Sequence, residues 1–210
     1  MKKILVPVDF SKASITAADV AYDVATRSGE TITMLHVIEE AVTDSYSIVG
    51  QGHPSNIEER LYTVELIRKS RKQLDKLVND PKYKDVLVEG ELRMGNPFHG
   101  MRTIITEHKV DLVVMGTRGH SKLEEMVIGS NTERVVRQMR CPVLTVHNKP
   151  ATLNFKNIVY ATAMSKDEEV FSRIVKRTQQ IYNSTVHLVR INTPGDFQRD
   201  KVVKDYMEKF

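Results

Sequence analysis

Short apolar runs alternate with helix-forming segments from residue 3 to residue 147, and no other feature of the sequence constrains the fold as tightly. Lys3–Asp9 and Thr31–Ile38 have the length of a strand and lack polar alternation, which is typical of strands buried on both faces of a parallel sheet. Further strands are expected at Val86–Leu92, Leu112–Met115 and Pro142–His147. This order predicts the α/β class: a doubly wound, five-stranded parallel sheet of order 3-2-1-4-5, with helices on both faces.

The first two expected helices follow the first two strands. One begins after Ser11 or Ser14, either of which can cap it, and ends at Gly29. The other is long and covers about Ile57–Val78. Its apolar residues predict the face that packs on the sheet: Leu61, Val64, Ile67, Leu74, Leu77 and Val78.

Two further helices and one loop complete the pattern. Gly95-Asn96-Pro97 opens a helix that runs to about His108, because proline suits the first helical position. Another helix is expected from Ser130 to about Arg140. Residues 39–55 are rich in Ser, Gly and Asp and lack periodicity, which predicts a mobile surface loop.

Spaced glycines in residues 111–133 separate a buried strand from a helix start. Two residues lie between Gly116 and Gly119, and nine between Gly119 and Gly129-Ser130. Backbone N–H groups at a helix start favour an anion such as phosphate, and glycine allows close approach of a ligand. The spacing is neither the Walker pattern nor the dinucleotide fingerprint. An alternative stays open, because Ser130 and Glu133 form a capping box that starts a helix without any ligand.

Asp9 favours the ligand-binding interpretation of this glycine segment. In an open parallel sheet, ligands bind at the carboxyl ends of the strands where the strand order reverses. The order 3-2-1-4-5 places the reversal between the first and fourth strands, which end at Asp9 and Gly116. Two sites far apart in the sequence are therefore expected to face one crevice. For Asp9, a role as a helix-capping residue remains the alternative.

Composition excludes several classes of function. The chain has 210 residues, 40% hydrophobic and 28% charged, which is ordinary for a soluble globular protein. The net charge is only +4 and the bases are spread along the chain, so we expect no nucleic-acid partner. The single cysteine, Cys141, excludes an internal disulfide, and the histidines show no metal-binding spacing. No apolar run approaches the ~20 residues of a membrane span, and none suits a signal peptide. We therefore expect a cytoplasmic protein with no membrane partner.

Residues 155–192 resemble the start of the chain at a constant offset of 154 residues, without a gap. We therefore expect a complete domain at 1–147, a linker at 148–154 and an incomplete second repeat at 155–210, which forms a partial C-terminal β-α-β unit. The second copy lacks the nucleotide motif, since Ala163 stands where the first copy has Asp9. A fragment of this size rarely buries enough surface to be stable alone. We expect it to pack on the first copy or on another subunit.

Several motifs within residues 2–147 resemble the universal stress protein family. They occur in the family's order: Pro7-Val8-Asp9, Leu35-His36-Val37, Gly95-Asn96-Pro97, Gly116-x2-Gly119-x9-Gly129-Ser130 and the closing Cys141-Pro-Val-Leu-Thr-Val146. The glycine motif is that of the nucleotide-binding members of the family. With its incomplete second copy, the chain is similar to a tandem member that has been cut short.

This resemblance implies a site for ATP with Mg²⁺. Asp9 would contact the ribose or adenine end, with Pro7 and Val8 beside it, and Val37 would contact adenine through its backbone. The phosphate path would be lined by Met115, Gly116, Arg118, Gly119 and His120. The phosphates would be held by Gly129, Ser130, Asn131 and Thr132. Mg²⁺ would sit mainly on phosphate oxygens, without a dedicated protein ligand. For Arg118 and His120, an exposed position without a ligand is an equal alternative.

Three functions remain open for this chain. The first is a nucleotide-dependent regulator in the stress response, with little or no turnover of ATP. The second is a slow ATPase or phosphotransferase, although the sequence offers no Walker lysine, kinase-like catalytic loop or evident base, so no catalytic residue is assigned. The third is a scaffold that does not bind nucleotide. As to assembly, the fifth strand is an edge of the expected sheet, and exposed edges favour pairing. We expect a homodimer, formed through edge strand 142–147 or through the C-terminal fragment.

Overall fold

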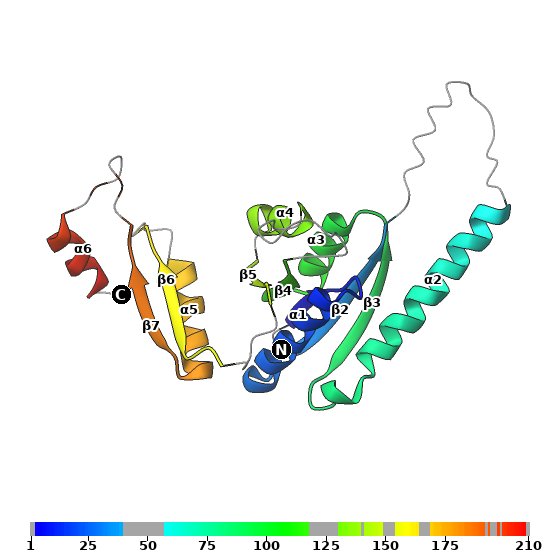
Figure 1. Ribbon diagram of the computed structural model, residues 1–210, viewed down its shortest axis with the longest axis horizontal. Coiled ribbons are helices and arrows are strands. Elements are labelled where there is room, and N and C mark those ends of the chain that lie inside the picture. Colours follow the sequence, from blue (N-terminus) through cyan, green and yellow to red (C-terminus); the bar gives the residue numbers. More distant parts are fainter. Residues whose placement is uncertain are drawn as a thin grey trace, which may run out of the picture. The chain divides into compact units, whose positions relative to one another are not determined.

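The computed structural model describes residues 3–39, 57–117, 130–139, 141–148, 154–163, 169–191, 193, 197 and 199–208. These residues belong to two compact units, Met1–Ala151 and Thr152–Phe210, each with its own sheet (Figure 1). The expected loop at 39–55 lies outside the described residues, apart from Glu39.

A five-stranded sheet forms the centre of the first unit. Its strands are β1 (Lys3–Pro7), β2 (Thr31–Ile38), β3 (Val88–Met94), β4 (Leu112–Gly116) and β5 (Val143–Val146). All neighbouring pairs are parallel, and the order is β3-β2-β1-β4-β5. The predicted doubly wound sheet of order 3-2-1-4-5 is therefore confirmed. The sheet reverses its order at β1, which pairs with β2 on one side and with β4 on the other.

The helices connect these strands: α1 (Lys12–Ser28), α2 (Ile57–Val78), the short 3-10 helix η1 (Pro81–Tyr83), α3 (Pro97–Glu107) and α4 (Ser130–Gln138). Ser11 caps α1, and Gly29 ends it with a left-handed φ of 69°. Asn96 caps α3 by accepting hydrogen bonds from Phe98 N–H and His99 N–H. The helix starts expected at Ser11 and at Gly95-Asn96-Pro97 and the helix end expected at Gly29 are therefore confirmed, and the two N-caps fix where these helices begin relative to the strand ends.

The two faces of the sheet have separate cores. Alternate strand residues Leu5, Leu35, Val113 and Met115 are buried together with residues of α3 and α4 (Phe98, Met101, Ile104 and Val135). The residues of opposite alternation are equally buried: Ile4, Val6, Ile32, Met34 and Val114. On that face β3 contacts Leu74 of α2, and β4 contacts Ala13 of α1. Helices therefore cover both faces, as the apolar runs predict.

Two sequence predictions about the first unit are wrong in detail. The long helix exposes Leu61 and Val64, at 60% and 61%, whereas both were expected in its packed face. Its buried line instead runs through Ser70 and Leu74, and at 100° per residue Leu61 and Val64 point away from that line. The third strand is also displaced, because it spans Val88–Met94 and not Val86–Leu92.

The second unit contains β6 (Asn157–Ala161), α5 (Glu169–Tyr182), β7 (Thr185–Val189) and α6 (Asp200–Met207). Its parallel strands pair Asn157 with Thr185, as β1 and β2 pair Lys3 with Thr31, and the corresponding residues are 154 apart in both cases. Asn183, which corresponds to Gly29, likewise has a positive φ, of 50°. The strand register and the positive φ at the end of the helix are thus the same at corresponding positions of the two units.

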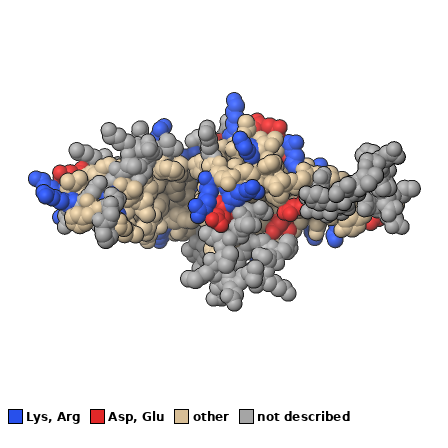
Figure 2. Space-filling model, turned by 90° about the horizontal axis from the view of Figure 1, so that it is seen from above, with Lys and Arg blue, Asp and Glu red and all other residues tan. Residues whose placement is uncertain are grey.

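Charged side chains of both signs are mixed on the described surface. Figure 2 shows Lys and Arg next to Asp and Glu on the face that it presents. Exposed pairs such as Arg137–Glu133 and Arg93–Glu107 contribute to this mixture. In the described part of the chain, no helix is both long and apolar enough to cross a membrane.

Candidate functional site

The carboxyl ends of β1 and β4 form the point where the strand order reverses, which is where open α/β sheets bind ligands. Pro7 ends β1 and leads directly to Val8 and Asp9, while Gly116 ends β4. Val37 lies near the end of β2, the neighbour of β1. The fold therefore brings Pro7, Val8, Asp9, Val37 and Gly116 to one edge of the sheet, as the sequence predicts.

Asp9 occupies a tight turn between β1 and α1. Its Oδ1 accepts a hydrogen bond from Ser11 N–H at 3.0 Å, and its own N–H donates to Ser14 Oγ at 3.4 Å. Ser11, not Asp9, is the N-cap, because Ser11 Oγ accepts from Ser14 N–H at 3.2 Å. The alternative role of Asp9 as the capping residue is therefore not what the structure shows. The turn holds a half-buried carboxylate beside the start of α1.

Gly116 is required by close packing of α1 on β4. A Cβ at this position would lie 2.9 Å from the backbone carbon and oxygen of Ala13, closer than real Cβ contacts. The φ of Gly116 is not in the left-handed region, so the glycine is explained by space and not by an unusual backbone angle. The first turn of α1 is consequently seated directly against the end of β4.

The side chain of Met115 is buried in the core. It is 6% exposed and packs in the core with Leu5, Leu35 and Phe98. A contact of Met115 with a ligand at the sheet edge must therefore come from its backbone.

Thr132 ties the start of α4 to the end of β4. Its hydroxyl donates to the Gly116 carbonyl at 3.1 Å, and the side chain is only 4% exposed. The residue is thus an anchor within the fold, and its N–H group belongs to the helix start that the sequence assigns to phosphate. The side chains of Ser130 and Asn131 lie outside the described residues, as do Arg118, Gly119, His120 and Gly129 as a whole.

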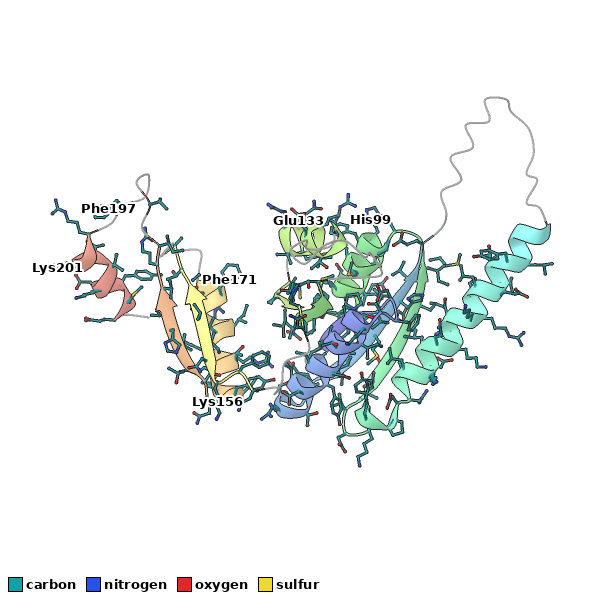
Figure 3. The ribbon with its side chains drawn as sticks, viewed as in Figure 1. His99, Glu133, Lys156, Phe171, Phe197 and Lys201 are labelled. Atoms are coloured by element: carbon teal, nitrogen blue, oxygen red, sulfur yellow. The ribbon has the colours of Figure 1, made fainter. Side chains whose placement is uncertain are left out.

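The starts of α3 and α4 lie side by side on the first unit. Figure 3 shows His99 and Glu133, each in the first turn of its helix, on the same side of this unit. The Arg134 guanidinium lies 5.1 Å from the ring centre of Phe98 and links the two helices through a cation–π contact. Glu133 Oε1 accepts from Arg137 Nε at 2.9 Å, so its carboxylate is engaged one turn along its own helix.

Sequence reasoning missed a polar contact at the neighbouring strand ends. The Thr117 hydroxyl lies 2.9 Å from His147 Nδ1, and Thr117 N–H donates to the Val146 carbonyl at 3.1 Å. Thr117 follows β4 and His147 follows β5, so the parallel register that places these strands side by side also brings the two residues together. The only available signal was their shared position, one residue past adjacent strands.

Among the described residues, Tyr83 and Cys141 have clearly raised pKa values. Tyr83 precedes β3 and Cys141 precedes β5, so both lie toward the amino ends of the strands. Burial raises the pKa of Cys141 to about 11, with a further contribution from the Asp111 carboxylate. Burial and a hydrogen bond to Asp19 raise the pKa of Tyr83. Both groups stay protonated at neutral pH, and neither supplies a base to the crevice. Within the described ranges, no group of three His, Cys, Asp or Glu side chains is arranged to hold a metal ion.

Backbone groups of Val37 lie near the carboxyl edge of the sheet and face β1. The β1–β2 ladder ends where Val8 N–H donates to the Leu35 carbonyl at 2.8 Å. In a parallel pair, every second residue turns both its N–H and its C=O toward the same neighbour, so Val37 turns both toward β1 as Leu35 does. No described residue of β1 or its following turn bonds to them. A donor and an acceptor side by side match the Watson–Crick edge of adenine, where N1 accepts and the 6-amino group donates.

Comparisons with known proteins agree with this fold. Residues 1–147 match the profile of the universal stress protein family. Over 145 residues the chain is 32% identical to universal stress protein YxiE of Bacillus subtilis, which covers 69% of this chain and 97% of that protein. The solved structure of protein MJ0577 of Methanocaldococcus jannaschii is 27% identical, with a TM-score of 0.58, and the match covers 71% of this chain and 98% of that one.

The likeness to solved structures also extends over both units. A universal stress protein of Archaeoglobus fulgidus has a TM-score of 0.74 and 20% identity, and the match covers 99% of this chain and 72% of that one. At this identity the likeness concerns the fold. The chain belongs to the universal stress protein family, as the family match over residues 1–147 and the 32% identity to YxiE show.

Proposed function

We propose that this protein binds ATP or a related adenine nucleotide and acts as a nucleotide-dependent regulator in the stress response, with little or no turnover. The observation that carries the proposal is the convergence of Asp9, the backbone of Val37 and the anchored start of α4 on one sheet edge. These groups differ in chemistry, and each suits a different part of the same ligand.

Each part of the nucleotide has a candidate partner. The N–H and C=O of Val37 suit adenine. The Asp9 carboxylate suits the ribose hydroxyls, because it can accept hydrogen bonds from them. The N–H groups at the start of α4, together with the glycines of the segment 116–129, suit the phosphates. Mg²⁺, which keeps several waters and binds phosphate oxygens, would be held mainly by the nucleotide.

A regulator is favoured over an efficient enzyme. Phosphoryl transfer needs a positioned base or nucleophile and strong charge neutralisation. In the described part of the crevice, the carboxylate of Asp9 is engaged by a backbone N–H and the hydroxyl of Thr132 by a backbone carbonyl. Weak hydrolysis by water remains the competing hypothesis, and a scaffold without ligand is the third.

Measurement of bound nucleotide and turnover distinguishes the three hypotheses. The protein is purified, its bound nucleotide is extracted and identified, and the emptied protein is titrated with ATP and Mg²⁺. Retention of ATP without product over many hours supports a regulator, whereas repeated turnovers support an ATPase. Absence of binding at millimolar ATP would contradict the proposal and leave the scaffold.

We also propose that the protein is a cytoplasmic homodimer, formed through the β5 edge or the C-terminal unit. In β5, Leu144 and Val146 turn toward β4, so Val143 and Thr145 turn their backbone groups away from the sheet. Thr145→Pro removes one outward N–H without removing a bond to β4. Light scattering of this variant should show a monomer if β5 forms the interface. An unchanged dimer would assign the interface to the second unit, and a monomeric parent protein would refute the dimer.

A further inference from the structure

The side chain of His36 lies where the β1–β2 ladder ends. After the bond from Val8 N–H to Leu35, a continued parallel ladder would have Val37 N–H donate to the Val8 carbonyl. That carbonyl is taken instead by His36, whose Nδ1 lies 2.7 Å from the Val8 oxygen. Since a carbonyl oxygen can only accept, Nδ1 carries the proton.

Phe10 turns the chain away at the same place. Its φ of 63° lies in the left-handed region, which is unusual for a residue that is not glycine. Its ring packs on His36, with the two ring centres 4.5 Å apart. The N–H of residue 10, which would have been the next donor to the Val37 carbonyl, is thereby removed from the ladder.

The opposite side of β2 stays paired beyond this point. Residues 36 and 38 pair with β3, and Gly95 N–H donates to the Ile38 carbonyl at 2.9 Å. Val37 is therefore held in extended form by β3 while its groups facing β1 have no partner among the described residues. The His36 side chain and the turn at Phe10 thus lie beside a ladder position whose donor and acceptor are not paired by any described residue.

We propose that His36 is a positioning residue that keeps Val37 available to adenine by holding the Val8 carbonyl. This inference rests on the proposed nucleotide site, whose adenine end it deepens. The second unit carries a related contact: its first-strand ladder ends with Thr162 N–H donating to the Val189 carbonyl at 3.0 Å, and the next residue, Arg190, donates to the Ala163 carbonyl. In each unit, the residue after the last carbonyl that accepts a bond from the first strand uses its side chain to bond a carbonyl just beyond that strand. These residues are His36 in the first unit and Arg190 in the second.

Two substitutions separate the hydrogen bond from the ring. His36→Phe keeps an aromatic ring against Phe10 but removes the donor, whereas His36→Asn loses the ring but can place an amide N–H near the position of Nδ1. Amide hydrogen exchange at Val37 is measured by NMR in the nucleotide-free, full-length proteins, and circular dichroism checks that they fold. Affinities for ATP and GTP are then compared, because the two share a triphosphate and differ at the base edge.

We expect His36→Phe to slow exchange at Val37 and to lower ATP affinity about five- to tenfold, the value of one hydrogen bond, with little change for GTP. His36→Asn should keep fast exchange and most of the ATP affinity. Unchanged exchange and unchanged ATP affinity in His36→Phe would overturn the inference, as would equal losses for ATP and GTP. If the parent protein binds no nucleotide, the proposed function fails, but the exchange comparison still decides whether His36 ends the ladder.

Discussion

Gly116 and Ala13 approach so closely that a Cβ on Gly116 would lie 2.9 Å from the carbonyl group of Ala13. Gly116→Ala should therefore push α1 from β4 and lower the free energy of unfolding by about 1–3 kcal/mol, as overpacking of cores does. Because Asp9 lies in the turn that starts α1, ATP affinity should fall as well. Urea unfolding and ATP titration measure the two effects.

Gly90→Ala is the matched control. Its Cβ would meet the side chains of Leu74 and Val78 at 3.1 Å, and side chains yield more easily than backbone. This variant should lose less stability and keep its ATP affinity. Equal stability losses in both variants would show that backbone contact at Gly116 has no special cost.

Asp9→Asn should weaken ATP binding by about tenfold while changing stability by less than about 0.5 kcal/mol, because asparagine keeps an oxygen for Ser11 N–H but loses the charge. Ser11→Ala provides the reverse case, since loss of a cap should cost about 1 kcal/mol and leave the ligand contact in place. Calorimetric titration and thermal melting are compared for the two variants. A stability loss without an affinity loss in Asp9→Asn would assign Asp9 to the turn alone.

Thr132→Val should destabilise the protein by about 1–2 kcal/mol, because the partly buried Gly116 carbonyl loses its donor. Thr132→Ser keeps the hydroxyl and should recover most of the stability. The start of α4 would also move, so phosphate affinity should follow the same order as stability, which titration with tripolyphosphate can measure. Tripolyphosphate binding that is the same in all three proteins would separate the anchor from the phosphate site.

Alkaline pH should destabilise the protein through Cys141. Its folded pKa of about 11 exceeds the ordinary value of 9.0, so below about pH 9 both states keep the proton and the contribution is complete. As pH rises toward 11, the unfolded chain releases its proton first, and stability falls by about 2 kcal/mol. Urea unfolding of the parent and of Cys141→Ala, under reducing conditions, should show a stability difference that shrinks over this interval. A constant difference would mean that the thiol does not contribute.

Residues 1–151 should fold and bind ATP without the second unit, with affinity within about twofold of the full chain if the unit adds no ligand contact. The match to YxiE supports this expectation, because it covers 97% of YxiE and 69% of this chain. Thermal melting tests whether the shortened protein folds, ATP titration measures its affinity, and light scattering measures its oligomer size. A change in oligomer size alone would place the dimer interface in the second unit.

The sequence predicts the sheet well because its signals there are local. The run Thr31–Ile38 and the caps Ser11 and Asn96 suffice to define β2, α1 and α3 without any knowledge of neighbours. The packed face of α2 is different, since Leu61 and Val64 fit a helical stripe as well as Leu74 does. Only the position of β3 decides which stripe is buried, and that position is a property of the whole sheet.

The candidate site likewise has features that the sequence predicts and features that depend on the folded structure. Asp9 and Gly116 could be assigned to one edge from strand order, but the reason for Gly116 could not, because it depends on the approach of Ala13. From the sequence, His36 is one more residue near a strand end. Its contact with Val8 arises from the register between β1 and β2, which brings together residues 28 positions apart.

The equal registers of β1–β2 and β6–β7 have a consequence for the folding chain. Each first strand has two possible partners that offer an equivalent parallel register, and such mispairing is a common failure of repetitive chains. Side chains supply the discrimination, since Leu5 and Leu35 are almost completely buried in the native first unit while Val159 and Val189 stay 67% and 39% exposed. A hybrid of β1 with β7 would bury a smaller apolar surface under α3 and α4. When the complete chain refolds, the bias toward correct pairing therefore develops only after those helices have docked, whereas during synthesis β2 is available to β1 long before β7 is made.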